Sequence, residues 1–311
     1  MLRSNWLMAL KCCFIFVEMK FKLIPLILFI VWFSGCRKSL FNSDQHTLNH
    51  DGVKRSYLLH LPTDYDHTQT NSLIIALHGG TGSAKNIEEQ SGLADFSDEK
   101  GFILCSPNGL NRTWNAGWCC GKANENGVDD VGFISKLIDE LIQEHNIDPK
   151  RVYVTGMSNG AFMTYRLACE ITDKIAAIAP VAGTMNFNQC EPSGSMNIIH
   201  FHSYLDSNVP YLGGVGDGIS DHYNSPLDSV FNFWAIHNNA PIKTETANDQ
   251  TFDYTSWTGG PDSSEVLWYM SHDGGHSWPM GTAPTRNSDA PSTKLNANEL
   301  MWDFFQKHPK N

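Results

Sequence analysis

The sequence predicts an α/β protein with a mostly parallel central sheet and helices on both of its faces. From Ser56 onward, short runs rich in β-branched and apolar residues alternate with segments whose apolar residues recur at helical spacing. Most of the short runs end at glycine, proline or asparagine, which favour turns. Neither an internal repeat nor a change in composition divides this part of the chain, so we expect residues 55–311 to form one domain.

The individual elements follow from these periods. In residues 130–145 the apolar side chains fall on one face of a helix, whereas residues 73–77 are a continuous apolar run of strand length. Only a short polar segment, 184–195, separates the strand expected to end at Val181 from the next one, so no large lid is expected. The expected strands are 73–77, 102–105, 151–155, 175–181, 197–201 and 265–270, and the expected helices are 130–145, 158–169, 230–237 and 295–307.

The first 35 residues have the parts of a signal segment. Met19 opens a lysine-bearing stretch, an apolar run follows, and Ser34-Gly35-Cys36 ends it, so Met19 is a candidate for the true start. The small residues before Cys36 resemble a bacterial lipobox, which predicts lipidation of Cys36 and an outer-membrane or cell-surface lipoprotein. A freely exported periplasmic or extracellular protein and a single-pass anchor are the alternatives. Residues 36–54 are polar and are expected to form a lipid-anchored tether with little structure.

The net charge of the chain restricts the classes of molecule that it is expected to bind. The formal net charge is −11, which disfavours binding to nucleic acid, and a membrane is expected to be reached only through the lipid anchor.

Export would place five cysteines beyond Cys36 in an oxidising compartment. Cys105 lies in an apolar run and is expected to stay free and buried. Cys169 and Cys190 are the favoured disulfide, while Cys119 and Cys120 pair with each other or stay reduced; no spacing resembles a zinc site.

The pentapeptide Gly156-Met157-Ser158-Asn159-Gly160 carries the strongest chemical signal. It lies where a strand is expected to turn directly into a helix, which is the context of the G-x-S-x-G nucleophile elbow of the α/β-hydrolase fold. Glycine is needed on both sides because the sharp turn brings backbone segments into close approach. The pattern therefore predicts that Ser158 is a nucleophile.

A serine nucleophile requires a histidine base and a carboxylate that orients the histidine, and in this fold they follow the serine in the order acid, histidine. His276 lies in a glycine-rich loop just after the last expected strand, and His272 is the alternative at the end of that strand. Asp206 follows the strand at 197–201. The other candidate acids lie deeper in the next segment and are Asp217, Asp221 and Asp228.

Backbone N–H groups are expected to stabilise the oxyanion of the reaction. The predicted donors are Asn159, directly after the nucleophile, and Gly80 in the loop after the strand at 73–77, with Thr81 as the alternative. His200 and His202 form a possible metal pair, but without an evident third ligand a role in the core or behind the site is favoured. Asp129-Asp130 is expected to cap the following helix rather than act in acid or base chemistry.

Several motifs together resemble the esterase family that groups polyhydroxybutyrate depolymerases with feruloyl and acetyl xylan esterases. The resemblance covers about residues 55–305 and implies the Ser158, Asp206 and His276 triad with Gly80 and Asn159 as oxyanion donors. Many relatives have His-Gly where this chain has His202-Ser203, and many have cysteine where it has Ala240. The motifs are Leu77-His78-Gly79-Gly80, Trp114-Asn115-Ala116-Gly117-Trp118-Cys119-Cys120, Asp129-Asp130-Val131-Gly132-Phe133, Gly156-Met157-Ser158-Asn159-Gly160-Ala161, Arg166-Leu167-Ala168-Cys169-Glu170 and Gly275-His276-Ser277-Trp278-Pro279.

These residues predict a carboxylic ester hydrolase that works through an acyl-enzyme without a metal or organic cofactor. We expect Trp278, Trp114 and Trp118 to border an open cleft, although Trp114 and Trp118 are equally compatible with the core. The expected substrate is an ester-bearing polymer. Removal of feruloyl or acetyl groups from plant polysaccharide fragments is favoured over depolymerisation of poly(3-hydroxybutyrate). The alternative from another class is a non-catalytic, glycan-binding surface lipoprotein.

Overall fold

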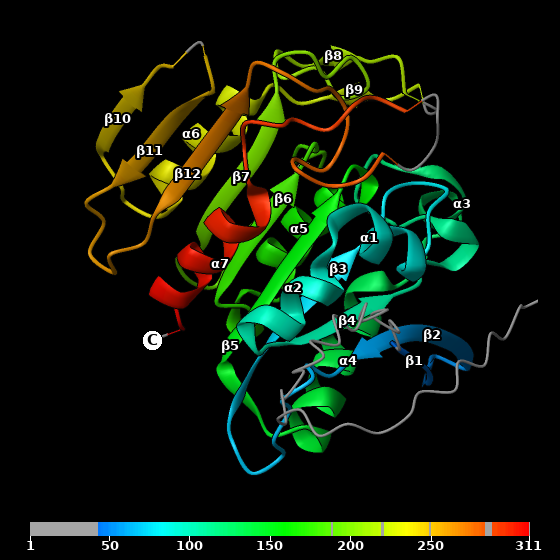
Figure 1. Ribbon diagram of the computed structural model, residues 1–311. Coiled ribbons are helices and arrows are strands. Elements are labelled where there is room, and N and C mark those ends of the chain that lie inside the picture. The colour runs from blue at the N-terminus through cyan, green and yellow to red at the C-terminus, as the bar shows by residue number, and fades with distance from the viewer. Residues whose placement is uncertain (1–42, 188, 219–220, 249, 284–287, 311) are drawn as a thin grey trace, which may run out of the picture. The chain divides into compact units, whose positions relative to one another are not determined.

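The computed structural model describes residues 43–310 except 188, 219–220, 249 and 284–287 (Figure 1). Within these residues, ten strands form one sheet in the order β1-β2-β4-β3-β5-β6-β7-β12-β11-β10. The strands are β1 (Asp44–His50), β2 (Val53–His60), β3 (Asn71–Leu77), β4 (Ile103–Pro107), β5 (Ile147–Met157), β6 (Ala177–Val181), β7 (Asn197–Ser203), β10 (Ile242–Thr246), β11 (Phe252–Thr258) and β12 (Val266–Ser271).

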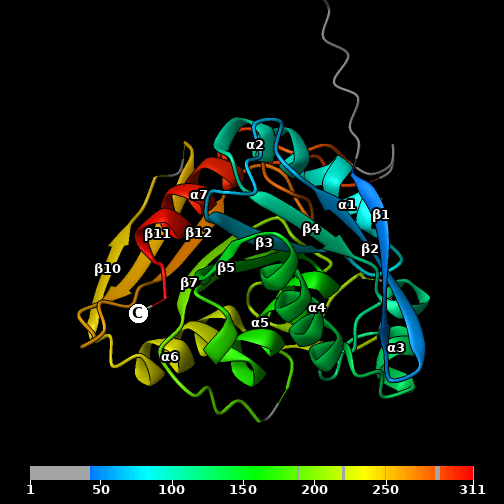
Figure 2. The ribbon, with the colours of Figure 1, turned by 90° about the horizontal axis from the view of Figure 1, so that it is seen from below.

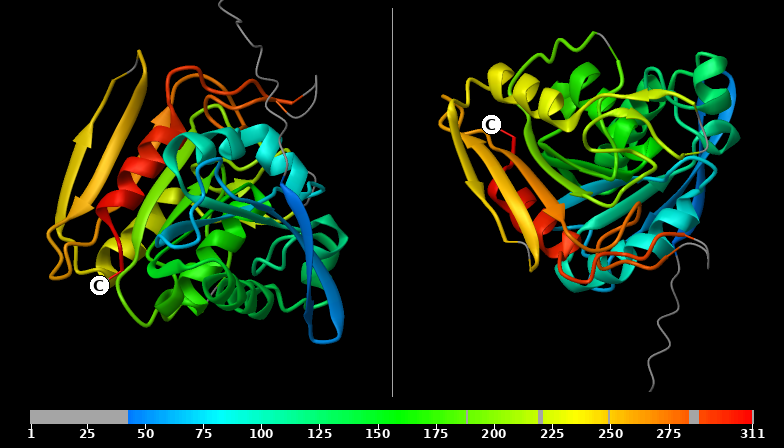
Figure 3. Two further views of the ribbon diagram at one scale, coloured as in Figure 1. Left: turned by 60° about the horizontal axis from the view of Figure 1, so that its bottom comes forward. Right: turned by 90° about the horizontal axis from the view of Figure 1, so that it is seen from above.

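The six central strands, from β4 to β12 in the sheet order, run parallel, and the strands beyond them are antiparallel. Figure 3 shows the two antiparallel margins, β1–β2 in blue and β10–β11 in gold, on opposite sides of the sheet. The prediction of a mostly parallel sheet is confirmed. Parallel strands bring their carboxyl ends to one edge, which places the segments after β5, β7 and β12 together.

Helices cover both faces of the sheet, as Figure 2 shows. On one face lie α1 (Ala84–Ser91), α2 (Leu93–Lys100) and α7 (Ala297–Lys307), and on the other lie α4 (Asp130–Glu144), α5 (Asn159–Glu170) and α6 (Leu227–His237). Alternate side chains of β3 point to the two faces, so Leu73 and Ile75 belong to one hydrophobic core and Ile74 and Ala76 to the other. The two cores fix the central strands that carry the loops described below.

The expected tether is wrong from Asp44 onward, because residues 44–50 form β1 and pair with β2 along its whole length. β1 is polar because it is an edge strand: Leu48 is its one buried residue, and the other side chains are exposed or half-buried. The predicted signal segment, its lipidation site at Cys36 and the rest of the tether up to residue 42 lie outside the described residues. Among the described residues, the helices are all too short or too polar to cross a membrane.

Short and polar elements escaped the sequence reasoning. α1 and α2 have eight residues each, and α3 (Gly121–Glu125) has five. The two-stranded pair β8 (Gly214–Val215) and β9 (Tyr223–Asn224) also carried no period long enough to recognise. Between β6 and β7, the described residues 182–187 and 189–196 contain no helix, in line with the expected lack of a large lid.

Candidate active site

Ser158 occupies a strained turn between β5 and α5. Its φ of 55° and ψ of −122° lie in a region that residues with a side chain rarely adopt. A Cβ atom added to Gly156 would lie 2.5 Å from the carbonyl oxygen of Gly160, and one added to Gly160 would lie 2.2 Å from the carbonyl oxygen of Leu77. Both glycines are therefore required by close packing. The Ser158 N–H donates to the Val181 carbonyl at 3.0 Å, which ties the turn to the end of β6.

Asp206 and His276 are joined by a hydrogen bond although they are 70 residues apart in the sequence. His276 Nδ1 lies 2.8 Å from Asp206 Oδ2, and Asp206 Oδ1 accepts the backbone N–H groups of Asn208 and Val209 at 3.0 and 2.8 Å. Burial alone would raise the pKa of Asp206, but His276, His202 and the Val209 amide outweigh burial and lower that pKa. The carboxylate is therefore ionised at neutral pH.

The loop after β12 presents His276 toward Asp206. Gly274 has a φ of 72°, and a Cβ atom on Gly275 would lie 2.4 Å from Asp289 Oδ2. The His276 N–H donates to that same Asp289 oxygen at 2.7 Å, which fixes the backbone at the histidine. His272, the alternative base, instead places Nε2 3.1 Å from Asp253 Oδ1. The geometry therefore selects His276 as the partner of Asp206.

The loop after β3 lies against Ser158. A Cβ atom added to Gly79 would lie 3.4 Å from the Ser158 Cβ, so the backbone at Gly79 approaches the nucleophile closely. His78 supports this loop: its Nδ1 donates to the Gly79 carbonyl at 2.7 Å, and its Nε2 accepts the Gly109 N–H at 3.0 Å. Gly80 is the next residue of this loop, and its role as an oxyanion donor stays a prediction.

The backbone and the side chain of Asn159 have different surroundings. Asn159 begins α5, so its own N–H has no acceptor within the helix, and its role as an oxyanion donor beside Ser158 stays a prediction. Its buried side chain binds the backbone of Trp114 in both directions, because Oδ1 accepts the Trp114 N–H at 2.7 Å and Nδ2 donates to the Trp114 carbonyl at 3.1 Å. The contacts of this side chain were not predicted from the sequence, since nothing in the local pattern indicated where the amide would point.

Residues 55–211 match the family described as Esterase PHB depolymerase. The chain belongs to this family. It is therefore a carboxylic ester hydrolase of the group that includes feruloyl esterases and polyhydroxybutyrate depolymerases, and the family resemblance noted in the sequence is confirmed.

The relatives named below have low sequence identity to this chain. The putative esterase NocK from Nocardia uniformis is 29% identical over 82% of this chain and 80% of its own length. The probable feruloyl esterase C from Aspergillus clavatus is 28% identical over 88% of this chain and 89% of its own. Feruloyl esterase B from Piromyces equi is 29% identical over 66% of this chain but only 40% of its own length. Among solved structures, an acetyl xylan esterase from Aspergillus awamori superposes with a TM-score of 0.58 at 16% identity, over 85% of this chain and 99% of that one, which supports the α/β-hydrolase fold.

Two of the three tryptophans expected at the cleft of this esterase are core residues. Trp278 is 1% exposed and its Nε1 donates to Asn298 Oδ1 at 2.9 Å, while Trp114 is fully buried and its Nε1 donates to the His78 carbonyl at 2.9 Å. The prediction that these two rings border the cleft is wrong, because both indoles pack inside and use their N–H groups there. Trp118 is different, since 48% of it is exposed.

A chain of buried hydrogen bonds leads from Tyr165 to Val209, the residue whose N–H donates to Asp206. Tyr165 Oη lies 3.0 Å from His200 Nδ1, His200 Nε2 lies 3.2 Å from His202 Nδ1, and His202 Nε2 lies 2.8 Å from the Val209 carbonyl. A carbonyl only accepts, so His202 carries its proton on Nε2, His200 donates to His202, and Tyr165 donates to His200. Burial lowers the pKa of both histidines, which keeps them neutral. All four ring nitrogens are used, which leaves none for a metal.

The remaining predicted residues have structural roles. Asp129 caps α4 by accepting the Gly132 N–H at 2.9 Å, so the expected cap is confirmed. Its neighbour Asp130 is buried against Arg55, with 2.6 Å between Oδ1 and Nη2. Cys169 is bonded to Cys190 and Cys119 to Cys120, while Cys105 is free and buried, and burial raises its pKa. The structure thus contains the favoured disulfide.

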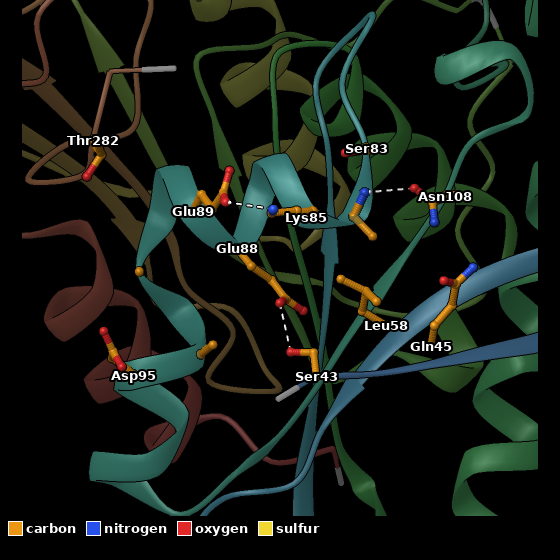
Figure 4. A pocket seen from close by; sticks show the side chains of 13 residues that line it. Ser43, Gln45, Leu58, Ser83, Lys85, Glu88, Glu89, Asp95, Asn108 and Thr282 are labelled. Atoms are coloured by element: carbon orange, nitrogen blue, oxygen red, sulfur yellow. Dashed lines mark hydrogen bonds and ion pairs between the residues drawn. The ribbon is translucent and has the colours of Figure 1, made fainter. Parts of the chain in front are cut away.

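A cavity of about 680 Å³ lies between α1 and the start of β1 (Figure 4). Glu88 points into it and accepts a hydrogen bond from Ser43 Oγ at 2.8 Å, and Asn108 Oδ1 accepts the Ala84 N–H at its rim. Ser158, Asp206 and His276 are not among its lining residues. This cavity is therefore separate from the three residues of the predicted triad.

Proposed function

We propose that the esterase cleaves its substrate through an acyl-enzyme on Ser158. The 2.8 Å contact between His276 Nδ1 and Asp206 Oδ2 carries the proposal, because it fixes the proton on Nδ1 and leaves Nε2 as the base. His276 Nε2 takes the proton of Ser158 Oγ as that oxygen attacks the ester carbonyl. The N–H groups of Asn159 and Gly80 stabilise the oxyanion, His276 returns the proton to the leaving alcohol, and water then releases the acid by the same steps.

Hydrolysis of p-nitrophenyl acetate tests this mechanism and its non-catalytic alternative together. Ser158→Ala should lower kcat by at least about 10³-fold, because the residual rate then depends on binding and oxyanion contacts alone. Ser195→Ala is a matched control, since Ser195 lies before the start of β7 whereas Asp206 follows its end, and Ser195 Oγ binds the exposed Asp262 carboxylate. Equal rates for wild type and Ser158→Ala would contradict the acyl-enzyme.

For the substrate, we propose feruloyl or acetyl esters on plant polysaccharide fragments. The support is the match to a probable feruloyl esterase over most of both chains, together with the exposed aromatic ring of Trp118, whose face can stack on a sugar or aryl group. The short connection between β6 and β7 also leaves room for a bulky polymer.

Poly(3-hydroxybutyrate) remains the second candidate because exposed apolar side chains surround the acid and base segments. Leu205 adjoins Asp206, Val215 and Tyr223 pair across β8 and β9, and Met280 follows the His276 loop; all four are more than half exposed. Such a surface suits an apolar polymer. Methyl ferulate, acetylated xylan and 3-hydroxybutyrate oligomers should be compared on one preparation. A kcat/KM at least tenfold higher for the oligomers, about 1.4 kcal/mol, would reverse the choice.

Export as a lipoprotein anchored through Cys36 is a further part of the proposal, resting on the sequence before residue 43 alone. Metabolic labelling with a fatty-acid analogue should tag the wild-type protein, and Cys36→Ala should abolish the tag. Cys105→Ala is the control, because that thiol is buried in β4. An unlabelled wild type would contradict the anchor.

A further inference from the structure

A groove beside α5 combines aromatic rings with planar polar side chains. Its volume is about 470 Å³, and we call it the Trp118 groove. A second hollow of about 690 Å³ shares Glu170 and Gln189 with it and extends along the Cys169–Cys190 disulfide to Glu191. The two hollows are therefore neighbours, and together they offer more lining residues than a single sugar ring would contact. The principal lining residues of the Trp118 groove are Asn115, Trp118, Arg166, Glu170, Phe187 and Gln189.

Trp118 is both exposed and rigidly held. Its N–H donates to the Asn186 carbonyl at 2.7 Å, and Gly117 before it has a φ of 85°. A Cβ atom on Gly117 would lie 2.2 Å from that same carbonyl oxygen, so the backbone is packed closely here. After Trp118, the Cys119 carbonyl accepts the Ala116 N–H at 2.7 Å and closes the turn. A ring that is 48% exposed on such a turn is a preorganised stacking platform.

Arg166 and Glu170 offer fixed polar groups without a net charge. Arg166 Nε donates to Glu170 Oε1 at 2.6 Å, and Arg166 Nη1 donates to the Asn115 carbonyl at 2.6 Å. The third guanidinium nitrogen of Arg166, Nη2, and the second carboxylate oxygen of Glu170, Oε2, remain for a ligand, and the side-chain amide of Gln189 adds a donor and an acceptor. Vicinal hydroxyls suit such planar pairs. The net charge of −11 and the nearby Glu191 disfavour an anionic ligand.

The groove lies at a set distance from the nucleophile. Arg166 is eight residues beyond Ser158 along α5, and at the helical rise of about 1.5 Å per residue this amounts to about 12 Å. The loop that carries Trp118 is held to this helix at both positions, because Asn159 binds the backbone of Trp114 and Arg166 binds the carbonyl of Asn115. A sugar chain long enough to cover this part of α5 would contact the groove while its acyl group lies at Ser158.

We propose that the Trp118 groove binds the neutral backbone of a polysaccharide, with a sugar ring stacked on Trp118 and its hydroxyls bonded to Arg166, Glu170 and Gln189. The site rests on the proposed function, since it holds the chain whose ester Ser158 cleaves. It adds a subsite remote from the reacting carbonyl.

Titration calorimetry of the full chain with ester-free xylohexaose tests the groove independently of catalysis, because this probe has no ester to cleave. Trp118→Ala should raise the Kd at least tenfold and Gln189→Ala several-fold. Ile236→Ala, at a residue 77% exposed on α6, should leave the Kd unchanged. Thermal melting should show all three variants folded, and Gln189→Ala carries the test alone if Trp118→Ala unfolds.

Two results would overturn the groove: wild type that binds neither xylohexaose nor cellohexaose, or a Trp118→Ala protein that binds as tightly as wild type. Stronger binding of hexagalacturonate than of xylohexaose would also overturn it, because the proposal requires a neutral chain. Failure to hydrolyse both acetylated xylan and methyl ferulate, with xylohexaose binding intact, would instead contradict the proposed substrate and leave the groove standing.

Discussion

Two histidines of the candidate active site, His276 and His78, have opposite surroundings. His276 keeps 12% of its side chain exposed and faces the ionised carboxylate of Asp206. His78 is 1% exposed and bonds only to neutral backbone groups, the Gly79 carbonyl and the Gly109 N–H. Burial, partly offset by the Gly79 carbonyl, lowers the pKa of His78 from its usual 6.5 to about 4. The Asp206 carboxylate can therefore stabilise a positive charge that forms on His276 during a reaction, whereas the surroundings of His78 keep that ring neutral.

The difference follows from what each side of the proposed reaction requires. The base becomes an imidazolium during attack, and a nearby carboxylate stabilises that cation. The loop at Gly79 must instead hold its backbone dipoles in a fixed direction, which a titrating group would disturb. Protonation of His78 would remove the acceptor for the Gly109 N–H and free the loop. In the proposed reaction, proton transfer thus depends on the ionic contact between Asp206 and His276. The geometry of the oxyanion donors depends on the hydrogen bonds that neutral His78 makes with the backbone.

The largest effect should come from removing the charge beside His276. Asp206→Asn keeps the size of the side chain but can donate to Nδ1, which selects the wrong tautomer and should lower kcat by about 10³- to 10⁴-fold. Asp228→Asn, at an exposed residue in the first turn of α6, is the control. The rate of p-nitrophenyl acetate hydrolysis by the two folded variants checks this. A loss below tenfold for Asp206→Asn would show that the ionic contact is dispensable.

A smaller loss of activity is expected from changing Asn159, whose neutral amide holds the loop beside the predicted oxyanion donors. Asn159→Ala removes the side chain that holds the Trp114 backbone and leaves a buried N–H and carbonyl without this partner, which should cost about 1–3 kcal/mol of unfolding free energy. We expect kcat to fall about 10- to 100-fold through misplacement of the neighbouring donors. Urea unfolding and kcat measured on the same protein check both effects. Unchanged stability would contradict the role given to this amide.

Stability should decrease as the pH falls from 6.5 toward 4, because buried histidines remain neutral in the folded protein. The unfolded chain takes up a proton at His78 near its usual pKa of 6.5, whereas the folded chain does so only near 4. His200 and His202 shift in the same direction. Between pH 7.5 and 5 the loss should be about 2 kcal/mol for His78, with further loss from the other two. Urea midpoints at both pH values measure it, and equal or greater stability at pH 5 would be the contrary result.

The smallest effect on kcat is expected at Tyr165, which supports Asp206 only through the two buried histidines. Tyr165→Phe removes the donor to His200 Nδ1 and leaves Asp206 and His276 unchanged. We expect kcat at pH 7.5 to stay within about threefold, with a stability loss of about 1–3 kcal/mol from the unpaired ring nitrogen. Tyr153→Phe offers a matched comparison, since Tyr153 Oη donates to the Phe305 carbonyl on the other face of the sheet. A kcat loss as large as that of Asp206→Asn would mean that the chain of histidines controls the acid directly.

The features that the sequence could predict are those determined by residues close together in the chain. The turn at Ser158 needs two glycines within five residues, so the local pattern predicted this turn and, with it, a nucleophile at Ser158. The long buried strands and α4 were equally recognisable because their apolar periods are continuous. β1 was missed because an exposed edge strand has little apolar pattern, and its pairing with β2 depends on the sheet beside it.

The supporting contacts could not be predicted because they join residues far apart in the chain. His78 and Gly109 are 31 residues apart, and Asn159 and Trp114 are 45 apart. Trp278 was expected at a cleft because it closely follows His276, and Trp114 because it lies in a glycine-containing loop. Their burial depends on the space left by α5 and α7, which no local pattern reveals.

Covalent labelling of Ser158 tests the central claim most directly. A fluorophosphonate probe reacts with a serine that an adjacent base activates, so the wild-type protein should gain one adduct, and peptide mapping should place it on the peptide that contains Ser158. Asp206→Asn should react far more slowly, because its histidine is a poor base, while Tyr165→Phe should react at nearly the wild-type rate. An adduct on another residue, or equal labelling of wild type and Ser158→Ala, would contradict the account.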